Sequence, residues 1–291
     1  MTQAKSASNA PFDRSLLRMR RQRAAGNLAR HDFLLREAGT RLLERVVDQQ
    51  QKFPLALNLG CHRGELTDLM AQHPGHGIAQ MIQCDTAPAM LHTVTGLRAA
   101  ADEEALPFAA QSFDLVMSIL SLHNVNDLPG SLVQIRRALR PGGMFLGSMF
   151  GGETLHELRQ CLAQAEIACD GGLSPRIAPM VDVRDAGALL QRAGFTRPVA
   201  DVDTITVSYR DPMALMRELR GMGESNILHA RRRHFLRRET LAAAMKLYHE
   251  NFSAPDGRVL ATFQLVNLTG WASVDNTQDA IKGQPKRLPQ I

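Results

Sequence analysis

Aromatic residues and cysteines are scarce in this sequence of 291 residues. Phenylalanine, tyrosine and tryptophan together make up 5% of the chain. This leaves little surface for stacking on bases, so a nucleic acid is not an expected partner. The cysteines form no Cys-x-x-Cys pair and no dense framework, which argues against a zinc site and a disulfide scaffold. They are Cys61, Cys84, Cys161 and Cys169, and such usage indicates a reducing compartment.

Long apolar runs and metal-binding histidine patterns are also missing. No apolar stretch reaches the roughly 18 residues that a transmembrane helix needs, and the N-terminus lacks the apolar core of a secretory signal. No histidine is followed two positions later by an aspartate or glutamate, and adjacent pairs such as His31-Asp32 do not face one another on a helix. We therefore expect no metal site.

The positive charge gathers in two places. The formal net charge is +5, and the clusters are Arg18, Arg20, Arg21 and Arg23, and Arg231, Arg232, Arg233, Arg237 and Arg238. Such arginines most simply form solvated helix faces, while contact with an acidic protein or the surface of an anionic membrane is the alternative. Residues 1–31 are accordingly expected to form a basic N-terminal arm.

A glycine turn between a strand and a helix is the most informative motif present. The apolar run 53–59 ends at Gly60, and a helical pattern follows from Leu66. A strand that is apolar throughout is typical of a parallel sheet covered on both faces. Gly60 and Gly64 would let the backbone turn sharply and approach a ligand.

An acidic residue follows the next strand. The run 79–84 reads as a strand and ends at Asp85. In dinucleotide-binding folds, an acid about 20 residues after the glycine turn accepts hydrogen bonds from the ribose hydroxyls. The sequence therefore predicts a site for a nucleotide-like cofactor.

Three further motifs appear in order: residues 101–108 (ADEEALPF), residues 112–118 (SFDLVMS) and the turn Arg140-Pro141-Gly142-Gly143. With the glycine turn, they resemble the class I S-adenosylmethionine-dependent methyltransferases. The resemblance implies a doubly wound, Rossmann-like α/β fold with a mostly parallel seven-stranded sheet, and S-adenosylmethionine as cofactor. The cofactor-binding positions implied are Asn58, Gly60, Cys61, His62, Gly64, Asp85, Asp102, Glu103 and Ser118.

Two positions depart from the usual pattern of that superfamily. Asn58 replaces an acidic residue, which removes a negative charge that would favour the cofactor's ammonium group. His62 replaces the middle glycine of the turn, so its side chain would crowd the methionine end of the cofactor. A positive φ at this residue would add about 1–3 kcal/mol of strain.

A narrower resemblance extends over residues 10–272. Its motifs are FDR at 12–14, SLH at 121–123, MFGGETL at 149–155, SPRIAP at 174–179 and GMGESN at 221–226. These look like the family of respiratory complex I assembly factor 5, and more distantly like the methyltransferase that esterifies a malonyl carrier protein in biotin synthesis. The resemblance implies modification of a protein side chain, an arginine of a complex I subunit or assembly intermediate.

Several polar residues of these motifs are candidates for the chemistry. His123 follows the fourth predicted strand, at the sheet edge where open α/β folds bind ligands, and is the candidate base. The candidate substrate-binding residues are Glu153, Arg176, Glu224 and Asn226. For compartment, we favour a bacterial cytoplasm, with the mitochondrial matrix as the alternative.

Periodicity predicts the remaining organisation. A methyltransferase-like domain spans residues 32–272, and a helical insertion over about 213–252, before the last strand, is the candidate cap that faces the substrate. Residues 273–291 lack periodicity and are expected to form a disordered tail. Three functions remain open: an enzyme that modifies a protein side chain, an O-methyltransferase for a small molecule or carrier-bound acid, and an assembly factor without catalysis.

Overall fold

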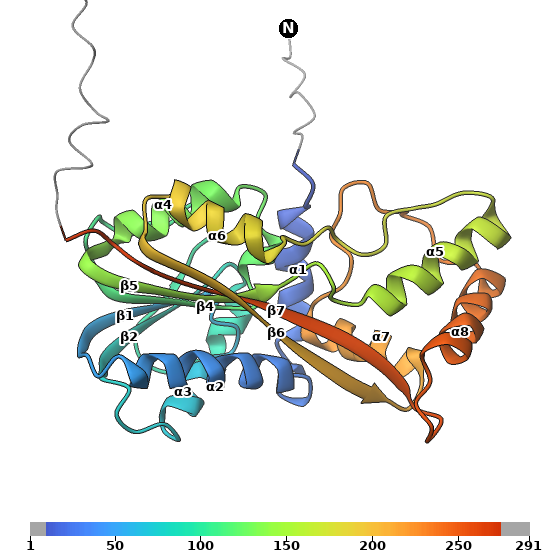
Figure 1. The fold of residues 1–291 in the computed structure, drawn as a ribbon, viewed down its shortest axis with the longest axis horizontal. Helices are drawn as coiled ribbons and strands as arrows, with labels where there is room; N and C mark the ends of the chain where they lie inside the picture. The colour runs from blue at the N-terminus through green and yellow to red at the C-terminus, as the bar shows by residue number, and fades with distance from the viewer. Residues whose placement is uncertain (1–9, 275–291) are drawn as a thin grey trace, which may run out of the picture.

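The computed structural model of the protein describes residues 10–274 and contains a seven-stranded sheet of order β3-β2-β1-β4-β5-β7-β6 (Figure 1). The strands are β1 (Phe53–Leu59), β2 (Ile78–Asp85), β3 (Arg98–Ala100), β4 (Phe113–Ile119), β5 (Leu139–Phe150), β6 (Thr196–Tyr209) and β7 (Val259–Trp271). Strands β1 to β5 are parallel to one another, and β7 is antiparallel to both β5 and β6. The predicted doubly wound, mostly parallel sheet is confirmed.

Helices cover both faces of this sheet (Figure 1). The α-helices are α1 (Arg14–Ala24), α2 (Phe33–Asp48), α3 (Glu65–Met70), α4 (Leu128–Ala138), α5 (His156–Asp170), α6 (Val183–Arg192), α7 (Pro212–Met222) and α8 (Arg238–Phe252). Three short 3₁₀ segments are η1 (Leu28–Arg30), η2 (Pro88–His92) and η3 (Leu122–Asn124). Helices α7 and α8 lie between β6 and β7, so the insertion before the last strand is confirmed.

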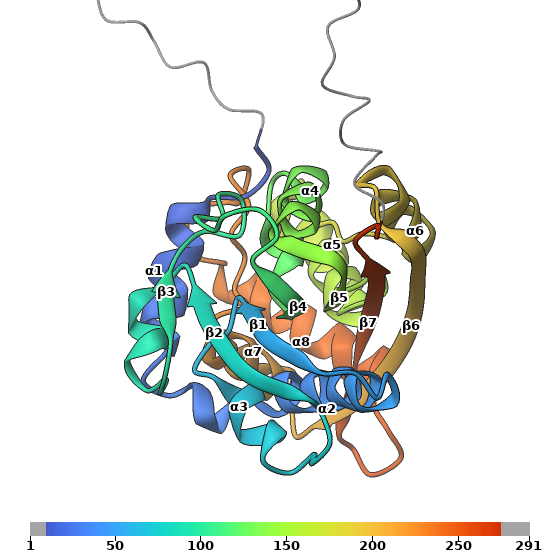
Figure 2. The ribbon, with the colours of Figure 1, turned by 90° about the vertical axis from the view of Figure 1, so that its left-hand side faces the viewer.

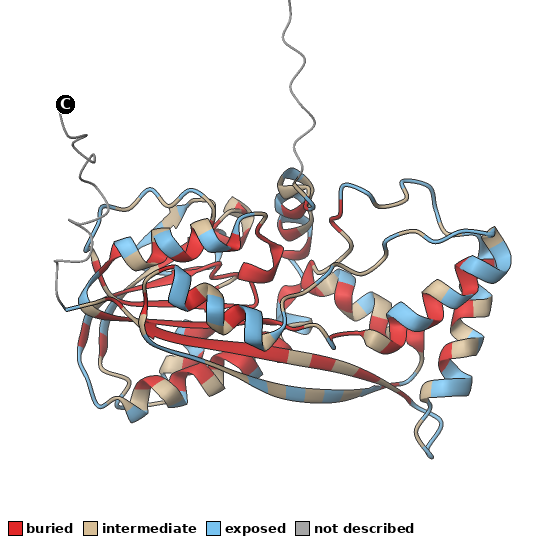
Figure 3. Ribbon diagram, turned by 45° about the horizontal axis from the view of Figure 1, so that its top comes forward, coloured by how far each residue is buried: buried red, intermediate tan, exposed pale blue. Residues whose placement is uncertain are grey.

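The core divides into two layers because successive strand residues point to opposite faces. Leu115 and Met117 of β4 pack with α2, α3 and the helices α5, α7 and α8. Val116 lies in the opposite layer, with α4 and α6. Figure 3 shows the central strands almost wholly buried, whereas β6 at the sheet edge alternates between exposed and partly buried residues.

Local chemistry explains several helix starts. The carboxylates of Asp127 and Asp211 accept hydrogen bonds from the backbone N–H of Gly130 and Ala214 in the first helical turns. Proline occupies an early helical position in both helices, where its missing N–H costs nothing. Asp127 and Asp211 therefore act as N-caps of α4 and α7.

The backbone is irregular at two element boundaries. Helix α5 begins at His156, after the left-handed Leu155 (φ +56°). The predicted turn 140–143 lies within β5, whose pairing with β4 shifts register beside Asp114, between Phe113 and Leu115. Gly142 provides the positive φ (+76°) that this irregularity uses.

Most of the predicted tail, from residue 275 onward, lies outside the described residues. Between residues 10 and 274, no helix has both the length and the apolar character required to cross a membrane.

Candidate functional site

Helix α1 lies at the carboxyl ends of the parallel strands, beside β3 in Figure 2. Its side chains contact Asp85 at the end of β2 and residues that follow β3 and β4. This edge is where open α/β sheets bind ligands. The expectation of a solvated basic arm holds for Arg18 and Arg23, which are exposed, but is wrong for Arg21, whose side chain is 1% exposed.

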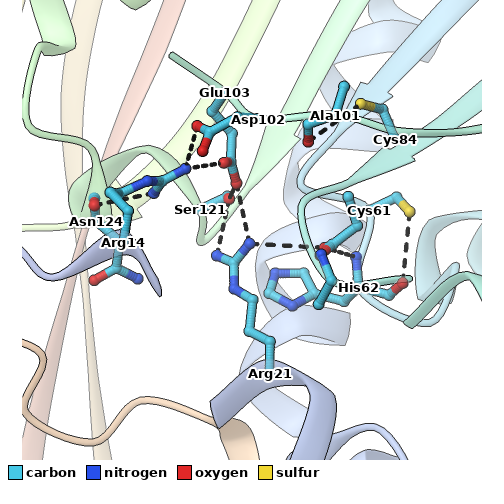
Figure 4. Close-up of polar contacts among 12 residues, drawn as sticks. Arg14, Arg21, Cys61, His62, Cys84, Ala101, Asp102, Glu103, Ser121 and Asn124 are labelled. Atoms are coloured by element: carbon cyan, nitrogen blue, oxygen red, sulfur yellow. Dashed lines mark hydrogen bonds and ion pairs between the residues drawn. The ribbon is translucent and has the colours of Figure 1, made fainter. Parts of the chain in front are cut away.

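Arg21 joins the acids at this edge (Figure 4). Its Nη1 donates to Glu103 Oε1 at 3.0 Å and lies 3.7 Å from Asp85 Oδ2, while its Nη2 donates to Ser121 Oγ at 2.9 Å. Burial works to lower the pKa of Arg21, but the nearby carboxylates of Asp85, Glu103 and Glu224 outweigh it and raise the pKa. The guanidinium therefore stays charged in a buried position.

Asp85 is buried, and its carboxylate is hydrogen-bonded to the backbone of the glycine turn. Its Oδ2 accepts from the backbone N–H of His62 at 3.1 Å and its Oδ1 from that of Ala87 at 2.8 Å. Burial raises the pKa of Asp85 to about 6, although Arg21 acts in the opposite direction. The acid predicted from its place after β2 thus holds the glycine turn and faces a cation.

Glu103 is fully buried between two arginines. Besides Arg21, Arg14 donates to it, and Arg14 Nη2 also donates to Asp102 Oδ1 at 2.6 Å. Burial would raise the pKa of Glu103, but Arg21 and Arg14 lower it to about 2. The structure therefore places Asp102 and Glu103 at the predicted edge, but paired with cations of α1.

The glycine turn has the strained geometry that its sequence predicted. Gly60 has φ of +69°, and a Cβ there would lie 2.2 Å from Ser121 Oγ. His62 also has a positive φ, of +50°. Gly64 (φ +89°) precedes α3, and the buried Cys61 packs in a small apolar cluster with Leu91 and Val94.

The side chain of His62 fills the space beside this turn. Its Nε2 lies 3.1 Å from the carbonyl oxygen of Ile119 and donates to it, and burial lowers the pKa of His62 to about 4. Neutral His62 thus keeps Nδ1 as an acceptor, and this atom has no partner, like the buried Oδ1 of Asn58. Asn58 and His62 line a cavity of about 10 Å³, roughly the room for one water molecule.

Ser118 is not brought into this site. It lies inside β4 with no exposed surface, and its Oγ has no hydrogen-bond partner. Ser121, three residues later in the loop after β4, contacts Arg21 and Glu103 at this edge instead.

A larger cavity of about 850 Å³ adjoins the site. His123 and Glu224 lie in its wall, with Nε2 of the histidine 3.2 Å from Oε2 of the glutamate. Asn124 Nδ2 lies 3.3 Å from the same carboxylate, and the His123 ring packs on Phe150 at 4.8 Å between centroids. Burial would raise the pKa of Glu224, but His123 and Arg21 lower it to about 2.

Of the other three predicted substrate-binding residues, two line the large cavity and one does not. Arg176 lines the large cavity and pairs with the buried Glu166. Asn226 lines it too, but its amide holds the chain by donating to the carbonyl of Pro175 and accepting from the N–H of Leu228. Glu153 has an exposed side chain and is absent from the wall, so the structure does not support its expected role.

Sequence reasoning missed Arg14, Arg21 and Ser121. A signal for the two arginines exists, because Arg14, Leu17, Arg21 and Ala24 recur at the three- to four-residue spacing of one helix face. Two arginines within an otherwise apolar stripe indicate buried acidic partners.

Replacing His62 with glycine should tighten the binding of S-adenosylmethionine to the turn. The substitution removes a ring from a cavity that has room for about one water molecule, and it relieves the cost of a positive φ. Calorimetric titration measures the change in affinity. Weaker binding in the variant would instead make the imidazole a ligand contact.

Acid should destabilise the protein through Glu103 and Glu224. Both have a folded pKa of about 2 against an ordinary 4.5, so their stabilising effect is present above pH 4.5 and is lost as the pH falls toward 2. Urea unfolding across this range measures the loss. The slope should be shallower in Glu103→Gln, and an unchanged slope would contradict the assignment.

Comparisons with known proteins agree with the methyltransferase fold expected from the sequence motifs. Residues 57–147 match the family model described as a methyltransferase domain. A solved structure from Bacillus halodurans, described as that of a methyltransferase, aligns with 79% of this chain and 98% of that chain, with a TM-score of 0.54 and 13% identity. The chain therefore has the class I methyltransferase fold.

Relatives at higher identity narrow this class. The arginine-hydroxylase NDUFAF5 of Danio rerio is 40% identical over 91% of this chain and 84% of its own length. A malonyl-[acyl-carrier protein] O-methyltransferase of Halorhodospira halophila is 35% identical over 85% of this chain and 84% of its own. The chain belongs to the family of methyltransferase-fold enzymes that contains NDUFAF5.

Proposed function

We propose that this protein binds S-adenosylmethionine and modifies an arginine side chain of a complex I subunit or assembly intermediate. The observation that carries the proposal is the similarity to NDUFAF5, named an arginine-hydroxylase, which extends over 91% of the chain. The relatives are named mitochondrial, whereas we propose a bacterial cytoplasm for this protein. The reducing compartment expected from its cysteines agrees with this location.

The polar groups at the sheet edge fit the proposed cofactor. In the proposal, the Asp85 carboxylate accepts hydrogen bonds from the ribose hydroxyls, and Asp102 contacts the adenine. The unpartnered Oδ1 of Asn58 and Nδ1 of His62 offer two acceptors for the ammonium group. When bound, S-adenosylmethionine supplies an electrophilic methyl group on a sulfonium.

His123 and Glu224 supply the proton chemistry of the proposal. His123 Nε2 lies 3.2 Å from Glu224 Oε2 and 3.0 Å from Asn124 Nδ2, and these contacts orient the ring, whose Nδ1 is buried without a partner. In the proposed mechanism, His123 carries its proton on Nε2, and Nδ1 accepts a proton from the substrate while Glu224 stabilises the imidazolium that forms. The same carboxylate attracts a substrate guanidinium that enters the cavity.

A carrier-bound acid is the second candidate substrate. The similarity to malonyl-[acyl-carrier protein] O-methyltransferase favours it, as do the arginines in the wall of the large cavity, among them Arg20, Arg176 and Arg231. Arg20 is partly buried beside Arg231, and burial and that neighbour lower its pKa. Such a pair of cations suits a carboxylate.

Mass spectrometry of candidate substrates tests the proposal. The purified protein with S-adenosylmethionine is incubated with complex I assembly intermediates, and in parallel with a malonylated carrier protein. The proposal predicts an arginine peptide that has gained one methyl group from S-adenosylmethionine in exchange for one proton. A methyl ester on the carrier with unchanged arginines would favour the second candidate, and no change in either would favour an assembly factor without catalysis.

A further inference from the structure

The guanidinium of Arg21 is buried in a polar site formed by residues from other parts of the chain, much as a bound ligand would be. It comes from the surface helix α1, yet its side chain is 1% exposed and its partners are 64 to 100 residues away in sequence. Asp85 and Glu103, the two acids that meet it, have no exposed side-chain surface. Charged groups are buried in this way only when they are paired.

The fit of Arg21 to this site is incomplete. Its two terminal nitrogens reach Glu103, Asp85 and Ser121, but its Nε is buried without a partner. A buried donor without an acceptor costs free energy, so the unpaired Nε–H weakens the interaction of Arg21 with this site. Free methylguanidinium is not attached to helix α1, so it can rotate in the site and pair more of its own N–H donors.

Arg21 also contacts Asp85, the carboxylate that the proposed function assigns to the ribose of the cofactor. Both oxygens of Asp85 already accept from backbone N–H groups, and Arg21 Nη1 lies 3.7 Å from Oδ2. The side chains of Asp85 and Arg21 are 0% and 1% exposed, so the space beside this carboxylate is filled. A ribose that donates to Asp85 would therefore have to displace the Arg21 guanidinium.

We propose that Asp85, Glu103 and Ser121 form a guanidinium-binding site whose resident ligand is Arg21, and that this guanidinium and the ribose of S-adenosylmethionine exclude one another. The exclusion rests on the proposed function, whereas the guanidinium site does not. In this arrangement, the N-terminal helix closes the cofactor site with its own side chain.

Rescue by methylguanidinium tests the guanidinium site. Arg21→Ala leaves two buried acids without their shared cation and should lower the thermal midpoint of unfolding. Millimolar methylguanidinium chloride should restore that midpoint with saturation, while sodium chloride at equal ionic strength should not. Arg23→Ala, an exposed arginine on the same helix, is the matched control and should show neither effect.

Two results would overturn the guanidinium site: a midpoint of Arg21→Ala that methylguanidinium does not raise, or an equal rise in Arg23→Ala. The double variant Arg21→Ala with Glu103→Gln removes the acid that binds the guanidinium and should show no rescue. If Arg21→Ala does not fold alone, Arg21→Gln keeps most of the side-chain volume, and its midpoint is measured in the same way.

Titration with S-adenosylmethionine tests the exclusion. Arg21→Ala should bind the cofactor at least about tenfold more tightly than the unmodified protein, and added methylguanidinium should weaken that binding competitively. Equal or weaker affinity in the variant would overturn the exclusion. Rescue by methylguanidinium with no cofactor binding in any variant would uphold the guanidinium site and overturn both the exclusion and the proposed cofactor.

Discussion

Glu103→Gln should lower the free energy of unfolding by about 3 kcal/mol. The substitution leaves Asp85, at 3.7 Å, as the one carboxylate of residues 10–274 within ion-pair distance of the buried Arg21, and it removes one of the three carboxylates that pair with Arg14 in the same part of the chain. Breaking a buried pair by removing one partner is costly because the other charge stays uncompensated. The size of the effect also measures how firmly α1 is held to the sheet edge.

Urea unfolding of Glu103→Gln and Glu153→Gln gives the comparison. Glu153 is exposed and outside both cavities, so its variant should stay within about 0.5 kcal/mol of the unmodified protein. Equal stability of the two variants would show that the buried arrangement of Arg21 and Glu103 does not hold in solution.

His123→Gln should lower the turnover of the modification reaction by about 10²- to 10⁴-fold. Glutamine can keep a hydrogen bond to Glu224, but it cannot take up a proton as the imidazole does at Nδ1. Substrate and cofactor affinity should change little, because the cavity wall keeps its shape.

The control for this variant is His156→Gln, at a histidine on α5 with a 40% exposed side chain that does not line the cavity. It should leave turnover unchanged. Turnover of His123→Gln close to that of the unmodified protein, or a loss that appears only as weaker substrate binding, would reduce His123 to a structural residue.

The sheet and its glycine turn could be predicted because their signals are local. The buried strand β1, the positive φ of Gly60 and the acid after β2 each follow from a few neighbouring residues. The insertion between β6 and β7 also follows, since its helical periodicity interrupts two strand patterns. Such features depend on the backbone and on burial of short segments.

The side chains that occupy the sheet edge, above all Arg21, could not be predicted from local sequence in the same way. Arg21 is one of five arginines on α1, and its partner Glu103 lies 82 residues away in sequence. Only the packing of α1 across the sheet edge decides which arginine is buried. The sequence likewise predicts Ser118, and not Ser121, as a cofactor-binding residue. The position at which β4 ends decides which of these serines reaches the glycine turn, and the local sequence does not show that position.

Calorimetric titration of the purified protein with S-adenosylmethionine tests the proposed cofactor site most directly. We predict binding of roughly micromolar affinity that is lost in Asp85→Ala, because the ribose hydroxyls would lose their acceptor. No binding by the unmodified protein, or binding that Asp85→Ala leaves unchanged, would contradict a cofactor site at this sheet edge.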